Sequence, residues 1–315
     1  MTDYVLGQSP TDGSDLASNG NTQVDNYTQT LNNGSIYKND LLMAESYNIG
    51  TFEPETIAAI PGNMSITAMT GAGKTKFIID LLSRVHHQFD AVYLFSRTAK
   101  AQEIYDFIPR ESIFDRYNEE FLVKLWNHHY TKKVTDKKTK LDKVLIIMDD
   151  IINDIEYKKS RIIDDYFTGG RHYNFSVWFL TQNFTSLKLL QRNNVRWAVA
   201  FDIDAKKERE KFVQSYLSAK NDRVGNLLFT KIVKERPYQA VVVEVYKNGA
   251  STEEKVKKYV ANPDVKSFRL KKNPPMVPTQ AVGLENLFLR TKRYEDEPVT
   301  NPGTIPRKSR TKRII

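Results

Sequence analysis

The chain contains the stretch "SITAMTGAGKTKFIIDLL", Ser65 to Leu82, in which an apolar run enters a glycine turn and a Lys-Thr pair opens an apolar helix. A strand, a glycine-rich loop and a helix in this order are typical of the phosphate-binding motif G-x-x-x-x-G-K-[ST]. The first glycine of that motif is replaced by Ala68. This position lies at the strand exit, where a small alanine fits if its φ angle is negative. The stretch therefore predicts an α/β fold with a phosphate site.

Each part of this loop has its own expected role in holding a nucleotide. Gly71 and Gly73 give the backbone the freedom to point successive N–H groups at phosphates, in front of a helix N-terminus. Lys74 would reach the β- and γ-phosphates, and the Thr75 hydroxyl would coordinate Mg²⁺. A glycine turn in a protein that binds no nucleotide is the alternative. The predicted ATP-binding residues are Thr70, Gly71, Ala72, Gly73, Lys74 and Thr75.

Apolar runs and helical segments alternate along the chain. The runs are continuously apolar, which is typical of strands covered on both faces, and hence of a mainly parallel sheet with right-handed crossovers. The expected strands are 64–69, 91–96, 144–150, 175–182, 197–203 and 238–246. The expected helices are 74–89, 101–108, 121–130 and a segment from 160 that ends in a loop. The fold class is therefore α/β, with helices on both faces of the sheet.

Two acids end the apolar run "VLIIMDD". In P-loop ATPases the first acid at such a strand end holds Mg²⁺ through water, and the second polarises the attacking water. Asp149 is thus the candidate metal ligand, beside Thr75, and Asp150 the candidate base. The alternative is a strand that ends in a solvated acidic turn.

The run "FSVWFLTQN" ends in Thr181, Gln182 and Asn183. A polar side chain here, on a strand between the strands of the phosphate loop and the acid pair, would contact both the γ-phosphate and the nucleophilic water. Gln182 is the candidate for this sensor role. A polar strand end without a catalytic role is the alternative.

An arginine follows two glycines in "GGRHYNFS". Gly169 and Gly170 predict a mobile loop that presents Arg171 to the γ-phosphate of a neighbouring subunit, where it would stabilise charge in the transition state. Contact with DNA phosphate or with a local carboxylate is the alternative. The rival arginines are Arg192, Arg196 and, more weakly, Arg97.

The composition of the chain limits the partners, metal sites and cellular compartments that it can have. The chain has 315 residues, a net charge of +9 and no cysteine. A basic balance favours polyanionic partners, nucleic acid first, and the lack of cysteine excludes disulfides and thiolate metal sites and favours a reducing compartment. We expect neither a signal peptide nor a transmembrane segment. The predicted organisation is a disordered polar arm over 1–45, an ATPase domain over 46–260 and a Pro-interrupted basic tail over 261–315.

Taken in order, "MTGAGKT", "VLIIMDDI", "GRHYNFSVWFLTQN" and "NNVRWAVAF" resemble the viral genome-packaging ATPases of the FtsK/HerA superfamily, in the poxvirus-type branch of large DNA viruses and virophages. The "GRH…S…FLTQ" segment is the most specific part, and the resemblance covers about residues 60 to 250. It departs from the family at Ala68, and Asp150 stands where cellular relatives carry Glu.

This resemblance implies a RecA-like P-loop ATPase that uses ATP and Mg²⁺ and pumps double-stranded DNA, independently of its sequence, into a preformed capsid. It implies roles in ATP hydrolysis for Lys74, Thr75, Asp149, Asp150 and Gln182. It further implies a homo-oligomeric ring, a partner at the capsid vertex or a membrane-associated capsid protein, and an assembly site in the host cytoplasm or nucleus, or a place in the virion. The lysine-rich segment 131–143 and the tail "RKSRTKRII" are candidate DNA contacts or solvated charge runs.

Three other functions stay open at this stage. A nucleoside or nucleotide kinase shares the phosphate loop but leaves the "GRH…FLTQN" segment unexplained. Another FtsK/HerA-type helicase or conjugation ATPase is hardly separable by sequence. A non-catalytic DNA- or capsid-binding protein with a degraded loop is disfavoured because Lys74, Thr75, Asp149 and Asp150 are intact.

Overall fold

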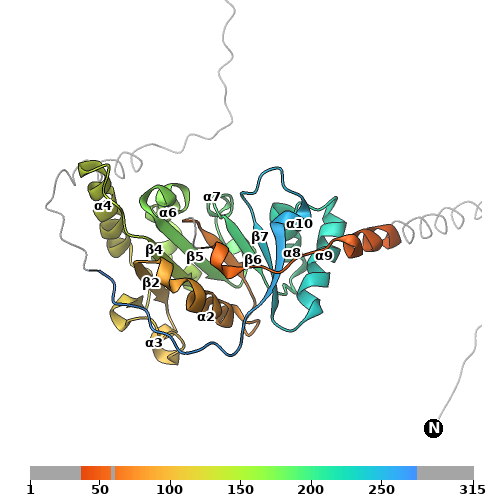
Figure 1. The fold of residues 1–315 in the computed structure, drawn as a ribbon, viewed down its shortest axis with the longest axis horizontal. Coiled ribbons are helices and arrows are strands. Elements are labelled where there is room, and N and C mark those ends of the chain that lie inside the picture. The colour runs from red at the N-terminus through yellow and green to blue at the C-terminus, as the bar shows by residue number, and fades with distance from the viewer. Residues whose placement is uncertain (1–36, 58–60, 275–315) are drawn as a thin grey trace, which may run out of the picture. The chain divides into compact units, whose positions relative to one another are not determined.

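A single eight-stranded sheet forms the centre of the computed structural model, which describes residues 37–57 and 61–274 (Figure 1). Its strand order is β3-β2-β4-β5-β1-β6-β7-β8. All pairs from β3 to β6 are parallel, whereas β7 is antiparallel to β6 and β8 is antiparallel to β7. The strands are β1 (Met64–Thr67), β2 (Ala91–Ser96), β3 (Ile113–Phe114), β4 (Val144–Asp149), β5 (Phe175–Thr181), β6 (Trp197–Ala200), β7 (Gln239–Glu244) and β8 (Val256–Val260).

Helices cover both faces of this sheet, with α2 and α3 on one side and α4 and α6 on the other (Figure 1). The helices are α2 (Lys74–Val85), α3 (Ala99–Gln102), α4 (Glu119–Thr135), α5 (Ile155–Lys159), α6 (Ile162–Gly169), α7 (Leu189–Arg192), α8 (Lys206–Tyr216), α9 (Asp222–Glu235) and α10 (Thr252–Lys255). Short 3-10 helices join them, at Pro54–Thr56, His86–Gln88, Arg110–Ser112, Ile151–Asn153, Gly170–Tyr173 and Phe184–Ser186. This arrangement confirms the predicted RecA-like α/β fold, and each of the six predicted runs contains a strand, although β1 ends at Thr67 and β6 at Ala200, earlier than expected. None of the described helices is both long enough and apolar enough to cross a membrane.

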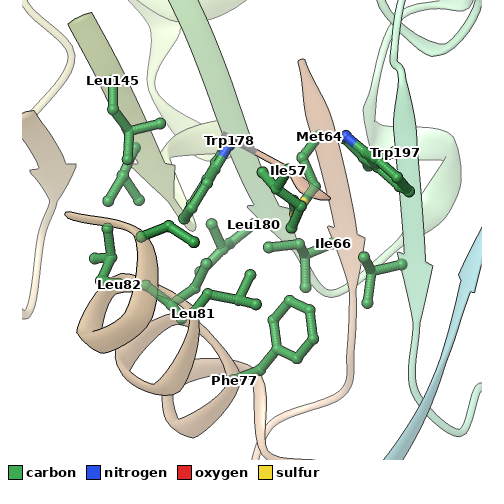
Figure 2. Packing of buried hydrophobic residues seen from close by; sticks show 14 of the residues in the cluster. Ile57, Met64, Ile66, Phe77, Leu81, Leu82, Leu145, Trp178, Leu180 and Trp197 are labelled. Carbon is green, nitrogen blue, oxygen red and sulfur yellow. The ribbon is translucent and has the colours of Figure 1, made fainter. Parts of the chain in front are cut away.

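The helix that follows the phosphate loop is held by its apolar face. Its buried residues recur with helical spacing, which places them in one stripe. In Figure 2 this stripe packs against Ile66 of β1 and against Trp178 and Leu180 of β5, all fully buried. Burial of a large apolar side chain stabilises by roughly 1.5–3 kcal/mol, so this contact fixes the start of α2 relative to β1. The stripe consists of Phe77, Ile78, Leu81, Leu82 and Val85.

The opposite face of the sheet is packed by alternate residues of the same strands, as the period of two requires. Phe175 of β5 contacts Tyr166 of α6, with ring centroids 4.8 Å apart, and Phe179 contacts Tyr157 of α5 at 5.3 Å. β5 is therefore buried on both sides, which explains its continuous apolar run.

Two local predictions were wrong. The helix expected over 101–108 is only the four-residue α3, because Glu103 adopts a left-handed φ of 53° and ends it. The loop expected at Gly169 and Gly170 is helical: α6 ends at Gly169, and a 3-10 helix continues to Tyr173. A Cβ at Gly170 would lie 3.3 Å from the Cβ of Phe175, so a glycine here serves close packing.

The helix expected over 121–130 is longer than predicted and extends into the lysine-rich segment 131–143. The first residues of that segment continue α4 as far as Thr135. Lysines in a last helical turn interact favourably with the helix dipole, which favours this extension. Asp136 then accepts a hydrogen bond from the Lys138 N–H at 2.8 Å and forms a turn before β4.

The described ends of the predicted arm and tail contact the domain. Residues 37–46 are helical, and Asp40 accepts hydrogen bonds from Asn221 and Arg223 at 3.4 Å each. Beyond β8, the Asn262 N–H donates to the buried carboxylate of Asp80 in α2 at 2.9 Å, and Asn273 bonds both backbone groups of Val92. The rest of the arm (1–36) and of the tail (275–315) lies outside the described residues, so the domain boundaries stay a prediction.

Candidate active site

The phosphate loop joins β1 to α2 at the carboxyl edge of the sheet. Gly71 and Gly73 have left-handed φ angles of 80° and 102°, which favour glycine. No side chain caps the N-terminus of α2, so its first N–H groups, which lack helical partners, are available to an anion. Ala68 is fully buried, and its φ is not positive. Both observations agree with the expectation that a small alanine fits at this position. Alanine at this position therefore leaves the cradle unstrained.

Lys74 faces the two acids at the end of β4. Its Nζ lies 3.0 Å from Asp150 Oδ2 and 3.8 Å from Asp149 Oδ1, and its side chain is 10% exposed. Asp150 itself has a φ of 51°. A left-handed aspartate is tolerated but uncommon, and such conformations gather at functional sites. The structure thus places the loop lysine and both predicted acids together.

Gln182 completes this group. β5 lies between β1 and β4 in the sheet, as the sensor role requires. The Gln182 Nε2 donates to Asp150 Oδ2 at 3.2 Å, from an exposed position just beyond the strand. Asp150 therefore accepts from both Lys74 and Gln182, and all three side chains meet where the γ-phosphate of a bound nucleotide is expected.

Tyr105 is a site residue that sequence reasoning missed. Its hydroxyl donates to Asp149 Oδ2 at 3.0 Å and is also bonded to Thr75. Burial raises the pKa of Tyr105 well above its ordinary value, so the hydroxyl stays protonated and donates. It was missed because it lies in the segment wrongly predicted as a helix, far in sequence from every motif, and no pattern in the sequence marks it.

The Asp149 carboxyl is held in an environment that suits a bound cation. Burial raises its pKa, Lys74 opposes this rise, the neighbouring Asp150 adds to it, and hydrogen bonds from Tyr105 and Ser96 oppose it. Its Oδ1 is buried and has no hydrogen-bond partner among the described residues. Mg²⁺ is bound in nucleotide sites by one or two oxygen ligands together with phosphates and water. An oxygen that accepts no hydrogen bond, on a carboxylate that shares the Tyr105 hydroxyl with Thr75, fits that requirement.

The candidate arginines lie elsewhere. Arg171 precedes β5 at the amino edge of the sheet, and β5 alone spans roughly 20 Å at about 3.3 Å per residue. Arg171 is exposed. Arg196 is ion-paired with Glu244 at 3.1 Å, Arg192 stacks on Phe184 at 5.0 Å, and Arg97 is paired with Asp154 at 3.7 Å on the carboxyl edge. The structure brings none of the four to Lys74.

A phosphate loop whose lysine meets two acids at the carboxyl edge of a RecA-like sheet defines a P-loop ATPase. The sequence model of the poxvirus A32 protein family matches residues 50–273, and the chain therefore belongs to that family. This membership confirms the resemblance that the motifs indicate and makes the chain an ATPase of the viral DNA-packaging class. No curated protein matches the chain.

Several solved structures are similar in fold. The genome packaging NTPase B204 of Sulfolobus turreted icosahedral virus 2, in complex with AMPPCP, is 16% identical over 66% of this chain and 98% of its own, with a TM-score of 0.44. The conjugation coupling protein TcpA of pCW3 is 10% identical over 74% of this chain and 66% of its own, with a TM-score of 0.45. EssC of Geobacillus thermodenitrificans is 15% identical over 74% of this chain and 44% of its own, with a TM-score of 0.44.

Proposed function

We propose that this chain is the motor subunit of a ring that hydrolyses ATP to move double-stranded DNA, whatever its sequence, into a preformed viral capsid. The proposal rests chiefly on one observation: Lys74, Asp149, Asp150 and Gln182 meet at one point in a member of the poxvirus A32 protein family. The geometry supports ATP hydrolysis, and the family supports the DNA-packaging task.

The phosphate loop would bind ATP as follows. The backbone N–H groups of Thr70, Gly71 and Gly73 would surround the phosphates at the positive end of α2. The Ala72 N–H donates to Met69 O at 3.2 Å in this structure and would join them on leaving that bond. Lys74 leaves Asp150 and contacts the β- and γ-phosphates, because a phosphate carries more negative charge than one carboxylate. Thr75 and, through water, Asp149 would hold Mg²⁺, which supplies neutralisation of phosphate charge when bound.

Asp150 and Gln182 would position the attacking water. Once Lys74 has moved to the phosphates, the Asp150 carboxylate loses its ion pair. It is then free to accept a hydrogen bond from the attacking water. Gln182, already 3.2 Å from that carboxylate, provides a second polar group that reads the γ-phosphate. Loss of the γ-phosphate would then remove a contact of Gln182 and so change the environment of the end of β5.

Arg171 would act on the neighbouring subunit. Its exposed position on the edge opposite Lys74 prevents it from reaching its own site but suits a contact across a ring interface. An arginine supplied in this way stabilises transition-state charge. Of the three arginines that precede β5 and β6, Arg192 and Arg196 are already engaged with Phe184 and Glu244.

The charge of the chain supports DNA as the cargo. A net charge of +9 favours sequence-independent contacts with phosphate. Within the described residues, Lys137, Lys138 and Lys140 are exposed in the turn after α4 and are candidates for such contacts. The basic tail, a ring of several copies, a capsid partner and a host-cell assembly site complete the proposal.

Tyr105→Phe tests the proposed Mg²⁺ site. Removal of the hydroxyl frees the Asp149 carboxylate to rotate, and loss of such an outer-shell partner typically costs about 10- to 100-fold in metal affinity. The Mg²⁺ concentration for half-maximal ATP hydrolysis is expected to rise accordingly. Tyr166→Phe removes another buried hydroxyl, which donates to Leu122 O at 2.8 Å on the opposite face, and should leave this concentration unchanged. An unchanged Mg²⁺ requirement in Tyr105→Phe would remove Asp149 from the metal site.

Stimulation by DNA tests the proposed cargo. ATP turnover of the purified chain is expected to rise on addition of double-stranded DNA of any sequence and to lose this stimulation steeply between 50 and 200 mM salt, since phosphate contacts release counterions. Phosphate release measured with two unrelated duplexes and with heparin, a polyanion that is not a duplex, provides the comparison. Stimulation by a nucleoside instead of DNA would favour a kinase and contradict the motor.

A further inference from the structure

An exposed tyrosine lies beside the phosphate loop. β7 is antiparallel to β6, with Ala200 opposite Val241, so the start of β7 lies at the carboxyl edge of the sheet, where β1 enters the loop. Tyr238 immediately precedes β7, and 63% of it is exposed. It belongs to none of the motifs in the sequence.

The Tyr238 side chain is in van der Waals reach of Gly73. A Cβ placed on Gly73 would lie 3.3 Å from Cδ1 of Tyr238 and 3.4 Å from Cε1 of the buried Phe201. Gly73 is the N-cap of α2, where the phosphates of a nucleotide are expected. The rings of Tyr238 and Phe201 therefore both lie next to Gly73 in the phosphate loop, and Tyr238 is the exposed one.

A turn between α9 and β7 explains the backbone of this tyrosine: the Gln239 N–H donates to Arg236 O at 3.3 Å, and Tyr238 occupies the third position, where type II turns have a positive φ. Its φ is 60°, a left-handed conformation that is a genuine outlier for a bulky residue. No hydrogen bond or ring pairing joins its side chain to other described residues. The turn does not account for the side chain, which stays 63% exposed beside the loop, where a ligand can cover the ring.

We propose that the Tyr238 ring forms one wall of the nucleoside subsite and stacks on the base of the bound nucleotide. The inference rests on the proposed binding of ATP phosphates at the loop and adds to it the part of the site that holds the base. A base lies one ribose away from phosphates bound at Gly73 and Lys74, which brings it to this edge of the sheet. Stacking on an aromatic ring tolerates every base, because each base has a π-face.

Binding of three ligands separates base contacts from phosphate contacts. Calorimetry in Mg²⁺ buffer would measure the affinities of ATP, GTP and inorganic tripolyphosphate for the wild type, Tyr238→Asn and Tyr238→Phe. Asparagine tolerates the left-handed conformation, so this variant removes the ring without adding strain. Tyr130→Ala, which removes an exposed tyrosine on α4, is the matched control.

Tyr238→Asn is expected to weaken the binding of ATP and GTP by about 5- to 150-fold, the range of one base–aromatic stack, and to leave the binding of tripolyphosphate unchanged. Tyr238→Phe and Tyr130→Ala should bind all three like the wild type. Unchanged ATP affinity in Tyr238→Asn, or an equal loss for tripolyphosphate, would overturn the stacking role while leaving the phosphate site intact. A wild type that binds none of the three ligands would instead overturn the proposed function and this inference with it.

Discussion

Lys74→Ala should lower the rate of ATP hydrolysis by at least about 100- to 1000-fold, the cost of removing one preorganised group that stabilises developing charge. The effect is large because Lys74 is nearly buried between Asp149 and Asp150. Without its ammonium group, the two carboxylates would face the nucleotide phosphates unneutralised, so binding and chemistry both suffer. Phosphate release at saturating ATP, with ATP affinity measured separately, divides the loss between the two.

The control for this variant is Lys211→Ala, which removes an exposed lysine on α8 and lowers the net charge equally. It should hydrolyse ATP like the wild type. Thermal unfolding of both variants shows whether the fold is retained. A folded Lys74→Ala protein with undiminished turnover would contradict the assignment of the loop as the ATP site.

Arg171→Ala should reduce turnover of the assembled ring by about 10³-fold or more, the effect of losing an arginine supplied in trans. ATP affinity should change little, because Arg171 lies on the edge of the sheet opposite Lys74. Arg110→Ala is the matched control: Arg110 is exposed and precedes β3 at the same edge, and its removal should leave turnover unchanged.

Mixing the two inactive variants distinguishes action in trans from a structural role. In a ring assembled from equal amounts of Lys74→Ala and Arg171→Ala subunits, about a quarter of the head-to-tail interfaces pair an intact loop with an intact Arg171. Turnover should therefore reappear on mixing. If each variant is inactive and the mixture stays inactive although mixed rings form, Arg171 does not complete a neighbouring site.

The sheet and the acid site could be predicted because their signals are local in sequence. Continuous apolar runs mark strands buried on both faces, and the carboxyl ends of parallel strands meet at one edge. That rule alone predicts that Asp149, Asp150 and Gln182 lie close to the phosphate loop. β8 was not predicted, because it carries two lysines within five residues and so has no continuous apolar run. Lysines of this kind suit a strand at the edge of a sheet.

Residues that depend on tertiary contacts could not be predicted. Tyr105 reaches Asp149 only because Glu103 ends α3 in a left-handed turn. Neither a glutamate nor a tyrosine in the sequence predicts such a turn. Likewise, Gly170 was interpreted as a source of mobility, whereas it allows close packing against Phe175. A glycine in sequence does not reveal whether freedom or small size is required.

Displacement of a third strand from double-stranded DNA tests the central claim most directly. A motor that moves along a duplex strips off a bound triplex-forming oligonucleotide, whereas an ATPase that only binds DNA does not. We predict ATP-dependent displacement by the wild type and none by Asp150→Asn, which keeps the shape of the side chain but loses its charge. Robust DNA-stimulated hydrolysis by the wild type without any displacement would contradict the claim that this site drives movement along DNA.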